Sequence, residues 1–493
     1  MSKKLNNNEI KSLGYKTEDL VKAAGNVARY LIKEDETMQG NKVLVFEVLK
    51  EVLLNPEKFE GNKIFFHLLH ELKKQKLSQN HQTELTELLE NQVFSLSEKP
   101  IHYAIYGKEN IEKDALLQMD MAMRLPISVA GSLMPDAHPG YGLPIGGVLA
   151  TTNNTVIPYA VGVDIACRMC LSVFDIEASY YVEQKKHLLK TYLEENTNFG
   201  INGQFYKPLD DDLFDSDVWN STKLIKGLRG KAISQVGTSG TGNHFVEFGI
   251  FELTETSPEI PLPAGKYLAL LSHSGSRGFG ATIAGYYSKL AMELSKLPKE
   301  AKHLAWLDRR TEAGMEYWIG MNLAGEYAAA NHHHIHKRMA KSLNAKPVLT
   351  IENHHNFAWE ETLADGTPVI VHRKGATPAH EGTLGIIPGT MATDAFVVKG
   401  RGEVHAINSA SHGAGRLMSR NKALTTFTKS QVKKVLSEKG ITLIGGDLDE
   451  APMVYKDIEK VMTAQTDLVE ILAKFHPKIV RMADADRKQP RED

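Results

Sequence analysis

Apolar residues recur at helical spacing through the first hundred positions. One apolar stripe comprises Leu20, Val21, Ala24, Val27, Ala28, Leu31 and Ile32, at the three- and four-residue intervals of one helix face. A second apolar run covers positions 43–54 and stops before Pro56, which cannot continue a helix. Further helical segments are expected around positions 63–76 and 82–91. Residues 1–100 are therefore predicted to form a small helical extension that serves packing or interaction.

Beyond residue 100 the pattern changes to short apolar runs followed by polar, glycine-rich turns. The run 268–271 leads directly into His273, and the run 348–351 leads towards His355. Short continuous apolar runs of this kind indicate buried strands. The segment AVGVDIAC (160–167) is interpreted in the same way. Side chains at the ends of several strands can converge on one site from rigid supports.

These two patterns predict the organisation of the chain. Its 493 residues exceed the usual size of a single domain. We expect a large mixed α+β domain over residues 101–482, preceded by the helical extension and followed by a polar tail at 483–493.

Composition and charge narrow the class of protein. The net charge of −2 gives no global basic field, so a nucleic-acid partner would be held by a local patch. The only two cysteines, Cys167 and Cys170, are too close together to staple a fold, which favours a reducing compartment. No signal peptide and no apolar run of about 18 residues is found, so no membrane partner and a cytoplasmic location are expected.

Five residues with metal-ligating side chains lie in polar, glycine-containing surroundings. They are Asp164, Cys167, His244, His273 and His355. Any one of these histidines is more often a hydrogen-bonded core residue than a ligand. Together, a carboxylate, a thiolate and several imidazoles are a transition-metal ligand set, in which one thiolate could bridge two ions.

Three other signals are interpreted as structural. The tract NHHHIH (331–336) continues a helical pattern, so its histidines point around the helix instead of converging. Cys170 is expected to be a buried strand residue without a redox role. The glycine-rich segment 237–248 matches neither the P-loop nor the dinucleotide fingerprint, although its turns could still contact a nucleotide.

Nine segments in order resemble the motifs of the RtcB family of RNA-splicing ligases. They are MPDAHPGYGLPIGG (134–147), AVGVDIAC (160–167), GTGNHFVEF (240–248), HSGSRGFG (273–280), NHHNFAWE (353–360), HRKGAT (372–377), IIPGTM (386–391), SHGAGRLMSR (411–420) and PMVYKDIEKVM (452–462). The resemblance covers roughly residues 101–482 and leaves the helical extension outside it.

The resemblance implies an RNA ligase that joins a 3′-phosphate, or a 2′,3′-cyclic phosphate, to a 5′-hydroxyl, using GTP and two Mn²⁺ ions, in RNA repair or tRNA splicing. His412 matches the nucleophile that carries GMP, and Asp136 and His138 match a motif near the reacting phosphates. Asp164, Cys167 and His244 resemble one manganese site, and Cys167, His273 and His355 resemble the second. An activating protein is a further expected partner.

Nucleotide and RNA contacts follow from the same resemblance. The expected GTP-binding residues are Asn243, His244, Phe245, Val246, Glu247, His355, Asn356, Pro388, Gly389, Thr390, Met391, Ala395, His412, Gly413, Ala414, Gly415, Tyr455 and Arg481. Arg277 and Arg420 are expected RNA-backbone clamps. Ala395 replaces a serine that is frequent in the family, and Arg481 replaces a lysine that contacts guanine.

Two other functions remain open at this point. A two-metal phosphoesterase or nuclease would need the metal ligands but not His412. A non-catalytic RNA-binding relative would use the helical extension to recruit a partner. An RNA substrate also predicts a local basic groove beside the metal ligands.

Overall fold

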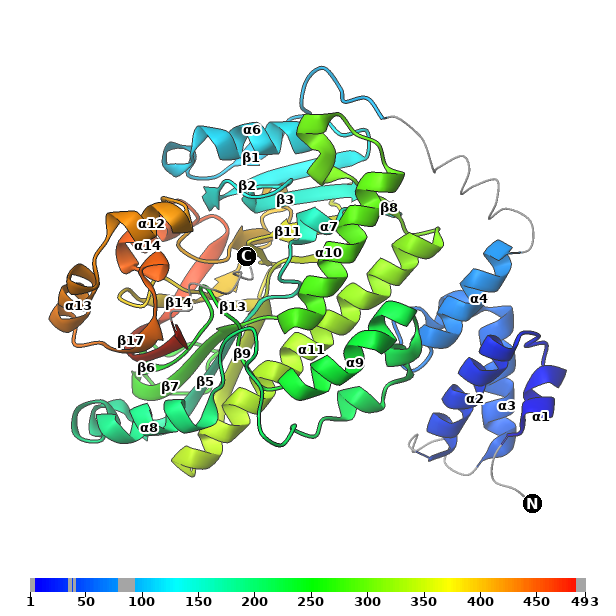
Figure 1. Ribbon diagram of the computed structural model, residues 1–493, viewed down its shortest axis with the longest axis horizontal. Helices are drawn as coiled ribbons and strands as arrows, with labels where there is room; N and C mark the ends of the chain where they lie inside the picture. Colours follow the sequence, from blue (N-terminus) through cyan, green and yellow to red (C-terminus); the bar gives the residue numbers. More distant parts are fainter. Residues whose placement is uncertain (1–4, 34–37, 39–40, 79–93, 485–493) are drawn as a thin grey trace. The chain divides into compact units, whose positions relative to one another are not determined.

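The computed structural model describes residues 5–33, 38, 41–78 and 94–484 (Figure 1). The chain divides into two compact units. The first comprises residues 1–91 with 215–226, and the second comprises 92–214 with 227–493. The predicted helical extension ended at residue 100, whereas the first unit also includes residues 215–226. Of the tail predicted at 483–493, Ala483 and Asp484 lie in a strand, and the rest lies outside the described residues.

The first unit is helical. Its described elements are α1 (Asn7–Ser12), α2 (Glu18–Lys33), α3 (Lys42–Leu54), η1 (Pro56–Phe59), α4 (Phe66–Ser78) and η5 (Asp217–Asn220). Helix α2 buries Leu20, Val27 and Leu31 in the core of the unit. The predicted helices at 20–32 and 43–54 are confirmed as α2 and α3. The segment predicted at 63–76 is an α-helix, α4, from Phe66 onwards. The helix expected at 82–91 lies outside the described residues.

An eight-stranded sheet is the centre of the second unit. Its strand order is β13-β14-β17-β6-β7-β5-β9, and β16 pairs with β17. The strands are β5 (Arg168–Glu177), β6 (Phe245–Leu253), β7 (Gly265–Ser274), β9 (Pro347–His354), β13 (Leu384–Ile387), β14 (Ala395–Gly400), β16 (Thr442–Gly446) and β17 (Val469–Asp484). Neighbours along this order are antiparallel, whereas β16 and β17 are parallel.

A second sheet of five strands has the order β1-β2-β3-β11-β10. Its strands are β1 (Ala104–Ile105), β2 (Ser128–His138), β3 (Ile145–Thr152), β10 (Phe357–Thr362) and β11 (Pro368–Lys374). Two short ladders pair β12 (Ala376–Pro378) with β15 (Ser409–Ser411), and β4 (Thr155–Val156) with β8 (Leu307–Asp308).

Helices cover the sheets of this unit. The longer ones are α6 (Lys113–Ala122), α8 (Lys186–Asn196), α9 (Lys223–Gln235), α10 (Arg277–Leu294), α11 (Glu312–Leu343) and α13 (Lys429–Glu438). Shorter turns are α7 (Pro158–Val161), α12 (Arg420–Thr426), α14 (Ile458–Thr463), η2 (Lys108–Asn110), η3 (Tyr180–Gln184), η4 (Asp212–Asp215), η6 (Lys299–Leu304), η7 (Val404–Ala406), η8 (Leu448–Glu450) and η9 (Pro452–Val454). Among the described helices, none has the length and apolarity needed to cross a bilayer.

Alternating side chains of the large sheet feed two separate cores. Leu268 and Leu270 of β7 pack towards α8 and α11, which lie over this face in Figure 1, while Ala269 and Leu271 pack on the opposite face. This alternation follows from the two-residue period of a strand. A third core lies between the two sheets. The expected α+β class is confirmed.

The side chain of Asn353 joins the two ends of the large sheet. Its Nδ2 donates to the Ile386 carbonyl oxygen at 3.1 Å, and its Oδ1 accepts from the Ile386 backbone N–H at 2.9 Å. Asn353 lies on β9 and Ile386 on β13, which are the first and last strands of the order. A side-chain amide therefore supplies the backbone hydrogen bonds that a further strand pairing would have made.

One predicted strand is wrong. Residues 158–161 form the single helical turn α7 instead of a strand that leads into Cys167. Pro158 occupies the first helical position, where a missing N–H costs nothing, and the turn ends at Gly162, whose φ of 108° suits glycine. The strand β5 begins after Cys167. The strands predicted at 268–271 and 348–351 are confirmed as β7 and β9.

A buried ion pair connects β11 with β10. Arg373, with no exposed surface, donates to both carboxylate oxygens of Glu361 at 2.5 and 3.1 Å, and also to Ser409 Oγ and to the Ile407 carbonyl oxygen. Burial acts to raise the pKa of Glu361, but hydrogen bonding to His380 and the charge of Arg373 outweigh it and lower the pKa to about 2. Glu361 therefore stays ionised inside the protein.

Replacing this arginine should destabilise the second unit. In Arg373→Met, Glu361 keeps its burial but loses its counter-charge, so we expect a loss of about 3–5 kcal/mol of unfolding free energy. Urea unfolding followed by circular dichroism measures the change. The control Arg310→Ala removes a more exposed arginine paired with Asp308, for which about 0–1 kcal/mol is expected. Equal effects of the two changes would contradict the importance of the buried pair.

Candidate functional site

Antiparallel pairing brings four strand ends to one edge of the large sheet. β5 starts just after Cys167 and β6 just after His244, whereas β7 ends at Ser274 and β9 at His354. The register pairs Phe245 with His273, and Arg168 with both Ser274 and His354. Because neighbouring strands run in opposite directions, the starts of β5 and β6 lie beside the ends of β7 and β9.

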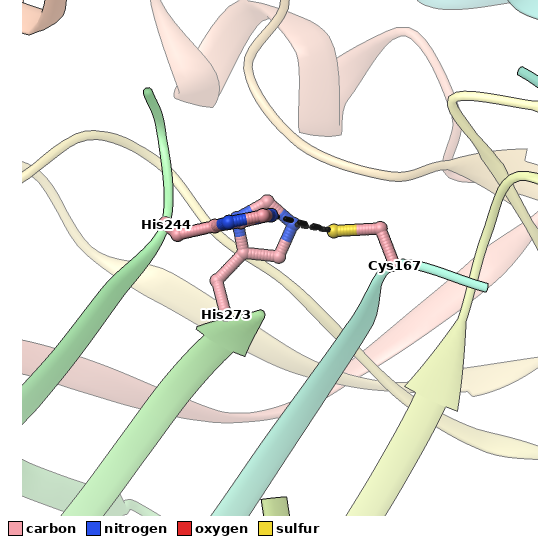
Figure 2. Close-up of side chains that lie close together, drawn as sticks. All are labelled: Cys167, His244 and His273. Atoms are coloured by element: carbon pink, nitrogen blue, oxygen red, sulfur yellow. Dashed lines mark hydrogen bonds between the residues drawn. The ribbon is translucent and has the colours of Figure 1, made fainter. Parts of the chain in front are cut away.

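The predicted ligands gather around the sulfur of Cys167. Figure 2 shows His244 and His273 directed towards it, with Nε2–Sγ distances of 3.4 and 2.9 Å. His273 Nε2 lies 3.3 Å from His355 Nε2, and His244 Nε2 lies 2.9 Å from Asp164 Oδ2. All five ligands proposed from the sequence are thus brought into one cluster.

The protonation states of this cluster suit coordination of a cation. Burial lowers the pKa of His273 to about 3 and that of His355 well below its ordinary value, so both imidazoles are neutral at pH 7. Burial acts to raise the pKa of Asp164, but the charge of His244 and its hydrogen bond outweigh this effect and lower it. The site therefore combines neutral imidazoles with an ionised carboxylate.

A hydrogen bond fixes the tautomer of His273. Its Nδ1 lies 3.2 Å from the Asn243 carbonyl oxygen, which can only accept, so Nδ1 carries the proton. The Nε2 lone pair then faces Cys167 and His355. Backbone carbonyls orient metal-ligating histidines in this way, and a thiolate, imidazoles and a carboxylate are transition-metal ligands. The residues present fit a metal centre.

His412 lies beside the cluster and is held from behind by Asp136. It follows β15, and its ring centroid lies 4.8 Å from that of His355. Its Nδ1 lies 2.7 Å from Oδ2 of Asp136, a fully buried residue of β2. Burial acts to raise the pKa of Asp136, yet the hydrogen bond and charge of His412 lower it overall. An ionised Asp136 accepts a hydrogen bond from Nδ1–H, which leaves His412 Nε2 as the nitrogen with a free lone pair.

Gly415 allows the His412 loop to press against β2. Its φ is 75°, and a Cβ atom at this position would lie 2.1 Å from the Asp136 carbonyl oxygen. Any other residue would push the loop away from β2 and lengthen the His412–Asp136 contact.

A cavity of about 810 Å³ opens onto the cluster and His412. The predicted site residues that line it are His138, Asp164, Cys167, Asn243, His244, Phe245, Glu247, His273, His355, Asn356, Pro388, Gly389, Thr390, Met391, Ala395, His412, Gly413, Ala414, Gly415, Arg420 and Tyr455. A cavity of this volume is within the usual range for small-ligand sites.

Four predicted residues do not line this cavity: Asp136, Val246, Arg481 and Arg277. Asp136 lies behind His412, as described above. Val246 packs in the core between the large sheet and its helices, because the side chains of successive strand residues point to opposite faces. Arg481 lines a neighbouring cavity of about 400 Å³. There its guanidinium lies over the Phe199 ring and pairs with Asp484.

The structure also corrects the role expected for Arg277. Its side chain is 1 % exposed, and it donates to Thr238 Oγ1 and to the Gly200 carbonyl oxygen. The guanidinium is used within the protein and is not presented to the cavity. The other expected clamp, Arg420, does line the cavity and is paired with Asp449 and Glu450.

Two further basic residues, Lys374 and Arg416, lie on the cavity wall. Lys374 lies in the segment HRKGAT and donates to the Tyr141 carbonyl oxygen. Burial lowers its pKa to about 7. Arg416 follows Gly415 and lies over the Tyr455 ring. Both lie inside motifs of the sequence, but only the tertiary structure shows that their side chains reach the cavity. With Arg420 they give the cavity a local basic wall, which Glu112 and Glu450 partly offset.

Glu247 is a buried acid of the cavity wall. Burial alone raises its pKa well above the ordinary value, so the side chain is a neutral hydrogen-bond donor and acceptor. A neutral carboxyl group can pair with both donor and acceptor groups of a ligand.

A second cluster of potential ligands, Cys170, His332 and His336, lies in the helix-facing core. Its imidazoles are hydrogen-bonded: His332 to Ser272 Oγ and the Ser274 carbonyl oxygen, and His336 to Ser172 Oγ and Ser272 Oγ. Burial raises the pKa of the Cys170 thiol well above its ordinary value. These contacts agree with the structural interpretation of both motifs. The expectation that the histidines of 331–336 do not converge is wrong for His332 and His336, because residues four positions apart share one helix face.

Ionisable and nucleophilic side chains gathered from distant segments into one cavity are typical of an enzyme. A sequence model of the family described as "tRNA-splicing ligase RtcB" matches residues 118–223 and 215–483. The chain therefore belongs to the RtcB family of RNA ligases.

Individual relatives agree with this assignment. The RNA-splicing ligase RtcB1 of Escherichia coli strain ATCC 25922 is 32% identical over 394 residues, covering 73% of this chain and 92% of the relative. The RNA-splicing ligase RtcB of Escherichia coli K12 is 31% identical with the same coverage. The tRNA-splicing ligase RtcB of Nanoarchaeum equitans is 30% identical over 447 residues, covering 76% and 92%.

The two cysteines provide a test of the metal centre. Co²⁺ bound to a thiolate shows a sulfur-to-cobalt charge-transfer band. We expect this band in the wild-type protein and in Cys170→Ser, and its loss in Cys167→Ser, because only Cys167 faces the cavity. Absorption spectra during Co²⁺ titration measure it. A band that survives in Cys167→Ser, or disappears in Cys170→Ser, would show that Cys167 is not the thiolate ligand of the metal.

Proposed function

We propose that this protein joins an RNA 3′-phosphate, or a 2′,3′-cyclic phosphate first opened by water, to a 5′-hydroxyl, with GTP as the co-substrate. The observation that carries the proposal is the position of His412, which Asp136 orients and which lies beside five metal-ligating side chains in a cavity of nucleotide size.

The first step would transfer GMP to the protein. The lone pair of His412 Nε2 attacks the α-phosphorus of GTP, forming a P–N bond as the bond to pyrophosphate breaks. Asp136 retains the hydrogen bond to Nδ1–H and stabilises the positive charge that develops on the ring. Covalent catalysis of this kind divides one difficult displacement into two easier ones.

Two further displacements at phosphorus would follow. An oxygen of the RNA 3′-phosphate attacks the phosphorus of the histidine-bound GMP, and the P–N bond breaks, which regenerates His412. The 5′-hydroxyl oxygen then attacks the activated 3′-phosphorus, losing its proton to solvent or to a base, and GMP leaves.

The five clustered ligands would hold Mn²⁺ ions. Asp164, Cys167 and His244 would hold one ion, and Cys167, His273 and His355 the other. Such ions neutralise phosphate charge and align attacking and leaving oxygens. Cys167 and His355 are held together by a backbone hydrogen bond from His355 N–H to the Cys167 carbonyl oxygen at 2.9 Å, which keeps these ligands in place.

The nucleotide would lie along the small residues of the cavity wall. Gly413, Ala414 and Gly415 let backbone approach the phosphates closely, and the segment 388–391 lines the same wall. The neutral Glu247 would contact the base. Arg481 lies on the neighbouring cavity, so a contact with guanine would require the base to extend towards that cavity.

Labelling with GTP tests the covalent step. Wild-type protein incubated with Mn²⁺ and α-³²P-labelled GTP should retain an acid-labile label, which His412→Ala should lack. Asp136→Asn should slow labelling by about 10²-fold or more, because the Nδ1–H tautomer loses its acceptor. The exposed histidine variant His405→Ala is the matched control and should label normally.

The same assay separates the alternative functions. RNA cleavage without labelling would indicate a two-metal phosphoesterase. RNA binding with neither labelling nor cleavage would indicate a recruitment role. Either outcome would overturn the proposal.

Lys374 predicts a pH dependence of nucleotide binding. Its lowered pKa of about 7 means that the side chain is mostly charged below this pH and mostly neutral above it. A protonated Lys374 attracts the triphosphate, so affinity should fall by about tenfold or more as the pH rises from about 6 to about 8. Lys374→Met should bind more weakly at low pH and lose most of this dependence. Calorimetric titration with GTP at constant metal concentration measures both. An unchanged pH profile in Lys374→Met would exclude this role.

A further inference from the structure

A second group of metal-ligating side chains lies on helix α4 of the first unit. His67, His70 and Glu71 occupy positions i, i+3 and i+4 of this helix. Side chains at these spacings share one helix face. The matched family region begins at residue 118, so this group is independent of the ligase site.

The donor atoms of the three side chains are close enough to share one ion. All of them lie within 4.8 Å of one another. His70 Nδ1 and Glu71 Oε1 are 3.4 Å apart, and the rings of His67 and His70 are nearly parallel, with an interplanar angle of 15°. Ligand atoms about 2.0–2.1 Å from a tetrahedral Zn²⁺ ion are themselves separated by about 3.3 Å. The observed spacing needs only small rotations to reach this geometry.

Burial makes this group different from a surface cluster. His70 and Glu71 are 7 % and 8 % exposed. His70 Nδ1 is buried and has no hydrogen-bond partner among the described residues. Buried polar atoms without partners are rare in folded proteins, and an unseen ion is one of their ordinary explanations. The contrast with His332 and His336 is direct, because serine and backbone groups satisfy both of those imidazoles.

Nearby carboxylates favour a cation at the same place. The carboxylates of Glu71, Asp217 and Asp19 are near enough to His67 to act on it electrostatically. Asp19 belongs to α2 and Asp217 to η5, and both lie in the first unit. The negative charges of these two carboxylates therefore favour a cation beside His67.

We propose that the first unit binds one divalent transition-metal ion, of the Zn²⁺ class, through His67, His70 and Glu71. Two imidazoles and one carboxylate are a common zinc ligand set, and water completes the tetrahedron. The ion would hold these three side chains together on one face of α4. Small helical units have limited cores, and a structural ion adds its binding free energy to their folding.

Metal stoichiometry of the full chain tests the proposal. Cys167→Ser is used as the background so that Co²⁺ bound without sulfur can be observed. Metal-free protein is equilibrated with Zn²⁺ or Co²⁺ and analysed by elemental analysis and absorption. Adding His67→Gln and His70→Gln should lower the metal content by about one ion per chain. The same changes should remove the ligand-field bands of the Co²⁺ ion bound on α4. The control His102→Gln, an exposed histidine of the second unit, should change neither.

Two further variants guard against a folding defect. The first is His67→Gln alone, at a position that is only partly buried, and the second is Glu71→Gln, which keeps the shape of the side chain. Each single variant should bind Zn²⁺ at least about tenfold more weakly than the background while keeping its circular dichroism spectrum. Wild-type affinity in both folded single variants, or an unchanged ion count in a folded double variant, would overturn the proposal. Guanylylation of His412 is not involved, so neither result bears on the ligase function.

Discussion

The antiparallel pairing of β6, β7, β5 and β9 is the constraint on which the site depends. Cys167 and His244 precede their strands, whereas His273 and His355 lie at or after the ends of theirs. In a parallel sheet these positions would lie at opposite edges. Here the register places Phe245 opposite His273 and Arg168 opposite His354, so segments that are far apart along the chain meet in one cluster. The ladder hydrogen bonds thus determine the geometry of the cluster.

Burial then determines the chemistry of the gathered groups. The same removal from water keeps His273 and His355 neutral, makes Glu247 a neutral acid and lowers the pKa of Lys374. Asp136 and Asp164 remain ionised because histidine partners more than offset their desolvation. Neutral bases, ionised carboxylates and a titrating lysine therefore lie in or next to one cavity, with burial setting the form of the first and last and histidine partners that of the carboxylates.

The two units differ in how they are held together. The second unit is built on long strands and buried polar connections such as Arg373–Glu361 and the Asn353 amide. The described residues of the first unit form helices around one apolar core. Residues 215–226 belong to it although the chain on either side belongs to the second unit. A small core of this kind gains stability from a bound ion, and the ion proposed on α4 would add its binding free energy to folding.

The sequence alone determined the local features of this protein. Periodic apolar residues identified α2 and α3, and continuous apolar runs identified β7 and β9. Residue types with their motif order singled out five candidate ligands and His412, which the structure places close together. These signals depend on neighbours along the chain, which a sequence displays directly.

Only the tertiary structure decided what depends on distant partners. It made 158–161 a helical turn, placed Asp136 behind His412, buried Arg277 and brought Lys374 to the cavity wall. An arginine in a glycine-rich motif has the same local sequence whether it faces RNA or the carbonyl of Gly200. Its environment is set by long-range packing, and packing energies depend on which segments meet in space.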